Sequence, residues 1–221
     1  MFAVVDYRMG NLKSVERGLI GVGANARITS DPGEIARADA VILPGVGAFA
    51  DAMRSMDALG ESQAIKDAIA AGKPFLGICL GLHLLFESGE EGAPEGGLVS
   101  GLGLAPGTVA HMPRVDAAGK AYKVPHVGWN TVERVAPANQ AAASNAAALF
   151  DGIPAGEYFY FTHSYIAPAS PFTIAETEHS VRFPSAIALS DRVFGVQFHP
   201  EKSSDAGKRL LENFVRIATS C

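Results

Sequence analysis

The sequence predicts an α/β fold with an open, mostly parallel sheet that is mixed at its edge and flanked by helices. Two observations lead to this prediction. Short apolar runs alternate with stretches of helical periodicity in the first part of the chain, and strand-like runs separated by turns follow in the last part. Strands that alternate with helices form parallel sheets covered on both faces. Functional side chains are then expected at the carboxyl ends of the strands.

The first part of the chain supplies the parallel strands. Phe2–Asp6 is a short apolar run that predicts a strand, and Asn11 is placed to cap a helix that follows. The apolar residues at helical spacing are Leu12, Val15, Leu19 and Val22. Further strands are expected at Ala24–Thr29, Ala40–Leu43 and Pro74–Ile78, with a helix at Ser62–Ala71.

The pattern changes in the second part. Ser88–Pro106 is rich in glycine and is expected to be irregular, and Asn139–Ala148 predicts a surface excursion or a short helix. Asp191-Arg192 is expected to join two later strands as a hairpin. The elements expected here are strands at Glu157–Thr162, Thr173–Thr177, Ala186–Ser190 and Val193–Phe198, and an amphipathic helix at Ser204–Thr219.

The composition argues against several classes of function. The chain has 221 residues, of which 48% are hydrophobic and 19% charged, and we expect one domain over residues 1–221. No apolar run is long enough for a membrane span and no secretory signal begins the chain, so a cytoplasmic location is expected. The net charge of −5 and the scattered lysines and arginines argue against nucleic acid as a partner. The cysteines, Cys79 and Cys221, and the histidines lack metal-ligand spacing, so no metal or cofactor is expected.

Cys79 is a candidate nucleophile. The sequence GICLG follows a buried-type strand and opens a helix, which is the context of a nucleophile elbow. Amide dipoles at a helix N-terminus favour thiolate over thiol, and the Leu80 N–H is placed to bind an oxyanion. The alternative is that Cys79 is a small apolar residue buried at a strand end.

His199 is a candidate base. In FGVQFHPEKS a buried-type strand ends at His-Pro-Glu, and Pro200 biases His199 towards an extended conformation. Residues two apart then project to the same side, so Glu201 is expected beside the imidazole while the other ring nitrogen faces the thiol. The alternative is a surface turn that happens to contain histidine and glutamate.

A third glycine-containing segment, LPGVGAF at residues 43–49, also follows an apolar run. Its glycines allow unusual dihedral angles, so its backbone amides are free to turn towards a neighbouring site. The segment is not a phosphate loop, because the glycine spacing differs and no Gly-Lys-Ser/Thr follows.

Together LPGVGAF, GICLG, PHVGWN, FTHSY and QFHPEKS resemble the class I glutamine amidotransferases, and among them the glutaminase subunits of imidazole glycerol phosphate synthases. The resemblance covers nearly the whole chain and implies the flavodoxin-like architecture of that family. It implies that Cys79 attacks the glutamine amide, that His199 activates the thiol and protonates ammonia, and that Glu201 orients His199. It also implies an oxyanion site formed by Leu80 and by Gly45, Val46 and Gly47, with a peptide flip in that segment as a gate.

The resemblance also implies a substrate site and a partner. The residues that it assigns to glutamine binding are Glu91, His163, Ser164 and Tyr165. The resemblance implies that ammonia passes to a separate (β/α)8 barrel synthase subunit, which would form imidazole glycerol phosphate and an aminoimidazole carboxamide ribotide. The residues that it places at or near this heterodimer contact are Asn11, Pro125, His126, Trp129, Tyr160 and Lys202.

Two positions depart from the family pattern. His83 stands where glutamine is usual, on the same helical face as Cys79. It replaces either the amide contact to substrate or the base, and substrate contact is favoured because no carboxylate corresponding to Glu201 accompanies it. Arg8 stands near the expected interface where glycine is common.

Two other functions remain open at this stage. A free-standing cysteine γ-glutamyl hydrolase would share the elbow and would act at full rate without a partner. A non-catalytic binding subunit would retain the elbow only as a relic, which the presence of Cys79, His199 and Glu201 argues against.

Overall fold

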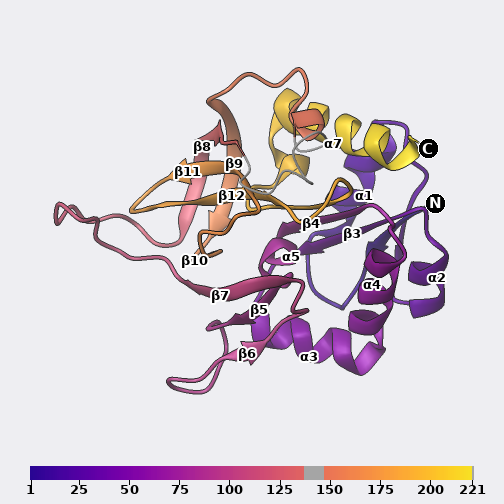
Figure 1. Cartoon of the computed structure of the whole chain (residues 1–221), viewed down its shortest axis with the longest axis horizontal. Helices are drawn as coiled ribbons and strands as arrows, with labels where there is room; N and C mark the ends of the chain where they lie inside the picture. The colour runs from indigo at the N-terminus through magenta and orange to yellow at the C-terminus, as the bar shows by residue number, and fades with distance from the viewer. Residues whose placement is uncertain (137–146, 221) are drawn as a thin grey trace.

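The computed structural model describes residues 1–136 and 147–220, and a nine-stranded sheet forms its centre (Figure 1). One half of the sheet is parallel, and the other half is antiparallel. The parallel strands, in spatial order, are β2 (Ala26–Thr29), β1 (Phe2–Val5), β3 (Ala40–Gly45), β4 (Phe75–Cys79) and β13 (Val193–Val196). The antiparallel strands continue as β12 (Arg182–Ala188), β11 (Thr173–Glu178), β8 (His126–Arg134) and β9 (Glu157–His163).

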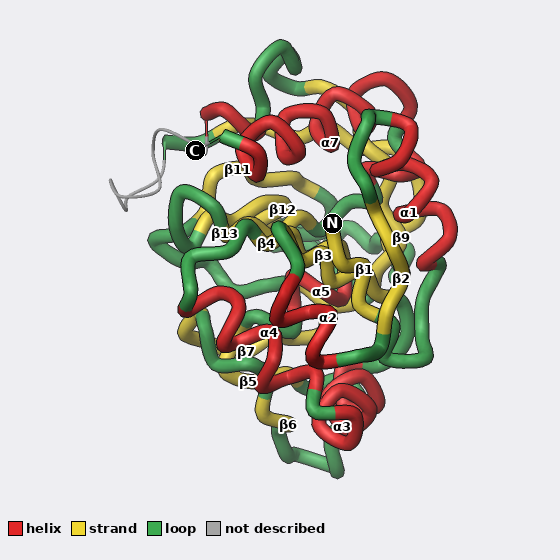
Figure 2. Tube along the Cα trace, turned by 90° about the vertical axis from the view of Figure 1, so that its right-hand side faces the viewer, coloured by secondary structure: helices red, strands yellow, loops and turns green. Residues whose placement is uncertain are grey.

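Helices cover both faces of the parallel half (Figure 2). One face carries α1 (Leu12–Gly21) and α7 (Ser204–Thr219), whose apolar sides form a buried cluster with β1 and β3. The opposite face carries α2 (Pro32–Arg37), α3 (Phe49–Leu59) and α4 (Glu61–Ala70). Within the described residues, no helix combines the length and the apolar character that crossing a membrane requires.

A second, four-stranded sheet lies beside the first. Its strands, in spatial order, are β10 (Tyr165–Ile166), β7 (Ala105–His111), β5 (Phe86–Gly89) and β6 (Val99–Ser100). The expectation that Ser88–Pro106 is irregular is therefore wrong in part. Glycine at position 101 lets two backbone segments of this sheet approach closely. A Cβ on Gly101 would overlap the carbonyl oxygen of Phe86.

The expected strands and helices otherwise agree with the structure to within a few residues, and β12 and β13 pair as the expected antiparallel hairpin. The sequence interpretation did not identify α2 and α3. Asp31 signals the start of α2, because its side chain accepts a hydrogen bond from the Gly33 N–H and Pro32 follows it. Most of the expected element at Asn139–Ala148 lies outside the described residues.

The parallel register brings the site together. Gly45 at the end of β3 is paired with Cys79 at the end of β4, and Val196 at the end of β13 is paired with Ile78. Because β4 lies between β3 and β13, segments that follow these three strands meet at one edge of the sheet.

Candidate active site

Cys79 ends β4 in a strained conformation. Its φ of 53° and ψ of −105° lie outside the regions that side chains other than glycine ordinarily adopt, and α5 (Leu80–His83) begins at the next residue. The residue is 5% exposed. A strained residue between a strand and a helix is the geometry of a nucleophile elbow, as the sequence predicted.

The glycines around the elbow are required by close backbone approach. A Cβ on Gly81 would overlap the carbonyl oxygen of Leu43 in β3, and a Cβ on Gly77 would overlap Gly81 itself. The helix that follows is a single turn, so the stabilisation that we expected from a helix dipole is limited to its first N–H groups. The Leu80 N–H is one of these groups, since the first residues of a helix have no intrahelical acceptor.

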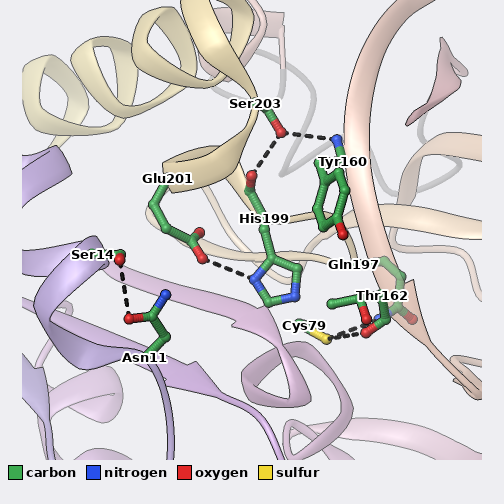
Figure 3. Close-up of polar contacts among 9 residues, drawn as sticks. All are labelled: Asn11, Ser14, Cys79, Tyr160, Thr162, Gln197, His199, Glu201 and Ser203. Carbon is green, nitrogen blue, oxygen red and sulfur yellow. Dashed lines mark hydrogen bonds and ion pairs between the residues drawn. The ribbon is translucent and has the colours of Figure 1, made fainter. Parts of the chain in front are cut away.

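His199 follows β13 and pairs with Glu201. Its Nδ1 lies 2.9 Å from Glu201 Oε1, and the two side chains are 3% and 2% exposed. Glu201 belongs to the short 3₁₀ helix η2 (Pro200–Lys202). Figure 3 shows the Nε2 of His199 on the side of the ring that faces Cys79, so the pair has the orientation expected of a base and its orienting carboxylate.

The pKa of His199 reflects this setting. Burial lowers it, but the neighbouring Cys79 and Glu201 side chains outweigh burial and raise the pKa to about 10. The buried Nε2 has no hydrogen-bond partner among residues 1–136 and 147–220. A protonated His199 stabilises a thiolate at Cys79 and keeps a proton available for a leaving group.

Ser203, which the sequence interpretation did not identify, fixes the main chain of His199. Its hydroxyl donates to the His199 carbonyl at 2.6 Å and accepts from the Tyr160 N–H at 3.0 Å, while the His199 N–H donates to the Tyr160 carbonyl at 2.9 Å (Figure 3). These contacts join the His-Pro-Glu turn to β9.

A pocket of about 480 Å³ opens at Cys79. Leu80 and two residues of the expected oxyanion segment, Val46 and Gly47, line it. Gly45, the third residue of that segment, does not line the pocket, and a Cβ on it would overlap the side chains of Tyr7 and Leu80. All five residues expected to bind substrate also line the pocket, namely His83, Glu91, His163, Ser164 and Tyr165.

His83 is buried and neutral. It is 3% exposed, and its Nε2 lies 2.7 Å from the Oε1 of Gln197. Burial lowers the pKa of His83 to about 4, against the opposing effect of the Gln197 hydrogen bond. His83 thus has a carboxamide partner where His199 has a carboxylate, which favours His199 as the base.

The imidazole of His163 is already fully engaged. Its Nδ1 donates to the Tyr165 carbonyl at 2.8 Å, so its Nε2 accepts from the Nδ1 of His126 at 3.0 Å. Burial holds the pKa of His163 well below its usual value. Contacts from residues 163–165 to a substrate are therefore best supplied by main-chain groups and by the side chains of Ser164 and Tyr165.

Glu91 has a structural contact beside its place in the pocket. Its Oε2 accepts from the Phe49 N–H at 3.2 Å, and its carbonyl accepts from the Ala50 N–H at 3.1 Å, so Glu91 caps the start of α3. Burial raises the pKa of Glu91, and the Phe49 hydrogen bond opposes this effect.

Most of the expected interface residues lie at the surface. Trp129 is 52% exposed and makes an edge contact with Tyr160 at 6.1 Å between ring centroids, and the Lys202 Nζ lies 5.8 Å from the Tyr160 ring. Asn11 is exposed at the start of α1, where its Oδ1 accepts from the Ser14 hydroxyl at 3.0 Å rather than from a backbone N–H. Pro125 is exposed and lines the pocket.

His126 differs from the other residues expected at the interface. It is 4% exposed, stacked between Phe161 and His179, and bonded to His163, so its ring does not form part of the surface. Any effect of His126 on a partner must therefore pass through these neighbours.

Arg8 occupies a left-handed conformation, with φ of 68°. This is the conformation that glycine adopts most readily, which explains why glycine suits the position. The N–H of Arg8 donates to Asp6 Oδ1 at 2.9 Å, and this turn accommodates the side chain at an exposed site.

Within the described parts of the chain, no group of three or more histidine, cysteine, aspartate or glutamate side chains is arranged to hold a metal ion. The groups around Cys79 are instead suited to acyl transfer. The sulfur and most of the residues expected to supply backbone amides line the pocket, whereas the His199–Glu201 pair is not part of the pocket lining.

Comparison with known proteins finds a matching family and similar proteins over nearly the whole chain. Residues 3–218 match the family described as glutamine amidotransferase class-I. The chain is 48% identical to imidazole glycerol phosphate synthase subunit HisH of Moorella thermoacetica, over 97% of this chain and 94% of that protein. It is 44% identical to the subunit of the same name from Aromatoleum aromaticum, over 98% of both chains.

Solved structures share the fold. A structure described as a glutamine amidotransferase superposes with a TM-score of 0.70 at 17% identity, covering 99% of both chains. The glutaminase domain of Trypanosoma brucei CTPS, solved with bound acivicin, superposes with a TM-score of 0.66 at 18% identity, covering 98% of this chain and 92% of that one.

Proposed function

This chain belongs to the class-I glutamine amidotransferase family, and we propose that Cys79, His199 and Glu201 are its catalytic triad. Its function is that of the glutaminase subunit of an imidazole glycerol phosphate synthase in histidine biosynthesis, acting on the side-chain amide of glutamine. The observation that carries the triad is that the buried His199–Glu201 pair follows β13, the parallel neighbour of the strand that Cys79 ends, with the Nε2 of His199 facing Cys79 (Figure 3).

The reaction begins with the Cys79 thiolate. The sulfur attacks the carboxamide carbon of glutamine, and the C=O electron pair moves to oxygen to give a tetrahedral oxyanion. The Leu80 N–H and the amides of the segment from Gly45 to Gly47 stabilise this oxyanion. His199, protonated and held by Glu201, gives its proton to the amide nitrogen, and the C–N bond breaks to release ammonia and leave a glutamyl thioester.

Hydrolysis restores the enzyme. His199, now neutral, accepts a proton from water as the water oxygen attacks the thioester carbon, and collapse of the second tetrahedral intermediate releases glutamate and the thiolate. Burial strengthens the attraction between the thiolate and the imidazolium, because Cys79 is 5% exposed and the His199 and Glu201 side chains are 3% and 2% exposed, so little water screens the charges.

The partner is a synthase subunit, which we propose to be a (β/α)8 barrel forming a heterodimer with this chain. Its docking surface is the exposed face of the β8–β9 ribbon, where Val127, Trp129 and Tyr158 are 57%, 52% and 55% exposed. Exposed aromatic side chains are typical anchors of interfaces. The same ribbon carries Thr162, whose carbonyl lies 3.8 Å from the Cys79 sulfur, so ammonia is released beside this surface.

Glutamate production with and without the synthase subunit and its nucleotide ligand tests this function. We expect slow hydrolysis by the chain alone, strong stimulation in the complex, and loss of both rates in Cys79→Ala. Replacing the other cysteine of the chain, Cys221→Ala, is the matched control and should leave both rates intact. A full rate without the partner would instead indicate a free-standing hydrolase, and activity retained in Cys79→Ala would exclude the proposed nucleophile.

A further inference from the structure

A buried carboxamide that the mechanism above does not use contacts the Cys79 sulfur. Gln197 lies between β13 and His199 and is 0% exposed. Its Nε2 is 3.7 Å from Cys79 Sγ, within hydrogen-bonding distance for sulfur (Figure 3). Its Oε1 is 2.7 Å from the Nε2 of His83. One side chain therefore bridges the candidate nucleophile and the histidine that departs from the family pattern.

The hydrogen bond with His83 determines which end of the carboxamide faces the sulfur. A carboxamide donates through nitrogen and accepts through oxygen. Neutral His83 with its proton on Nε2 donates to Oε1, which turns the NH₂ group of Gln197 towards Cys79. A flipped carboxamide would place a second carbonyl oxygen at the sulfur, where the Thr162 carbonyl already lies 3.8 Å away.

The sulfur needs this donor when it is ionised. Cys79 is 5% exposed, and an acceptor oxygen such as that of Thr162 disfavours a thiolate. A hydrogen bond donated to the charged form stabilises it, and charge-assisted hydrogen bonds are stronger than neutral ones. The Gln197 amide thus offsets the effect of the Thr162 carbonyl from another side of the same atom.

We propose that Gln197 is a further catalytic residue, whose side-chain amide donates a hydrogen bond to the Cys79 thiolate, and that His83 is a positioning residue that fixes the direction of this amide. This inference rests on the proposed role of Cys79 as the nucleophile. It gives His83 a role through Gln197 in addition to its place on the pocket wall. A glutamine at position 83 would also offer a donor to Gln197 Oε1.

The pH dependence of Cys79 alkylation by iodoacetamide tests the proposal. The full-length chain is used, and peptide mass spectrometry separates Cys79 from Cys221. Gln197→Met keeps the length of the side chain without the donor, and Gln197→Glu replaces the donor by an oxygen. We expect the midpoint of alkylation to rise by about one pH unit in both variants, the size expected for loss of a hydrogen bond to a charged group.

The two substitutions of His83 form a matched pair. His83→Leu removes the donor that orients Gln197 and should raise the midpoint, whereas His83→Gln keeps a donor and should retain the wild-type midpoint. This pair decides the question if circular dichroism shows that the Gln197 variants do not fold. The proposal is overturned if the folded Gln197 variants keep the wild-type midpoint, or if His83→Leu and His83→Gln behave alike.

The same titration separates this inference from the proposed function. A wild-type midpoint near the ordinary thiol value of about 8.5 would contradict activation of Cys79 itself. A lower wild-type midpoint that does not respond to Gln197 would leave the nucleophile intact and overturn only the role of the carboxamide.

Discussion

The Nδ1 of His199 lies 2.9 Å from the Oε1 of Glu201, and the two side chains are almost completely buried. The extended backbone of His199, with φ of −101° and ψ of 94°, projects both side chains to the same side across Pro200. The pairing commits Nδ1 to the carboxylate and leaves Nε2 for Cys79. The acid and base roles proposed for His199 depend on this division between its two nitrogens.

Glu201→Gln keeps the shape of the side chain and removes its charge. Because Glu201 is one of the groups that raise the pKa of His199, the pKa should fall and the alkaline limb of kcat/KM for glutamine should move to lower pH. Loss of the orienting charge should also lower kcat by roughly 10²- to 10⁴-fold. Glutaminase pH profiles of the complex check both effects, with exposed Glu95→Gln as the control. An unchanged alkaline limb would contradict the pairing.

Trp129→Ala should weaken binding of the synthase subunit. Truncating an exposed aromatic anchor at the centre of an interface typically costs about 2 kcal/mol, which is roughly a 30-fold increase in Kd. Calorimetric titration with the partner measures the change. Leu98→Ala is the matched control, because Leu98 is 55% exposed but lies next to β6, outside the β8–β9 ribbon. Equal effects of the two substitutions would rule out the ribbon as the docking surface.

Glu61 should make the stability of the chain depend on pH. It is 0% exposed, and neither carboxylate oxygen has a hydrogen-bond partner among the residues that the structure describes. Burial and Asp6 raise its pKa from 4.5 to about 7, with Arg8 acting in the opposite direction. Between these two pH values the folded chain holds a proton that the unfolded chain releases. The free energy of unfolding therefore falls as pH rises above 4.5, and the loss is complete above pH 7.

Glu61→Gln removes this ionisation. Its free energy of unfolding should exceed that of the wild type by about 3 kcal/mol at pH 8, with a much smaller difference at pH 5. Urea unfolding at both pH values measures this, and Glu95→Gln makes the same charge change at an exposed site. A pH-independent difference between Glu61→Gln and the wild type would show that burial does not perturb this carboxyl.

Local patterns were sufficient to predict the parallel half of the sheet. Strand-length apolar runs bounded by turn residues indicated β1, β3 and β4, and the periodic apolar residues of Ser204–Thr219 predicted α7 with its observed bounds. The small second sheet was not predicted, because Pro106 and Gly107 interrupt the pattern of β7, and because β6 and β10 have two residues each and are defined by pairing with distant segments. Strands this short leave no period to detect.

In the candidate site too, local sequence could indicate some residues and not others. Cys79 and His199 could be proposed from the sequence because Cys79 ends a predicted strand and His199 follows one, each in a distinctive local sequence. Gln197 could not be assigned a role from the sequence, since its contacts are made with side chains 114 and 118 positions away. Burial of His126 was equally hidden, because it follows from stacking against Phe161 of β9 and against His179, the residue after β11.

The most direct test of the account is covalent labelling by a diazo-ketone analogue of glutamine, located by peptide mass spectrometry in the wild type and in His199→Ala. We predict a single adduct on Cys79 in the wild type, and a labelling rate at least about 100-fold lower in His199→Ala because the thiolate loses its imidazolium partner. An adduct on another residue, or equal labelling rates in the two proteins, would contradict the central claim that His199 activates Cys79 for attack on glutamine.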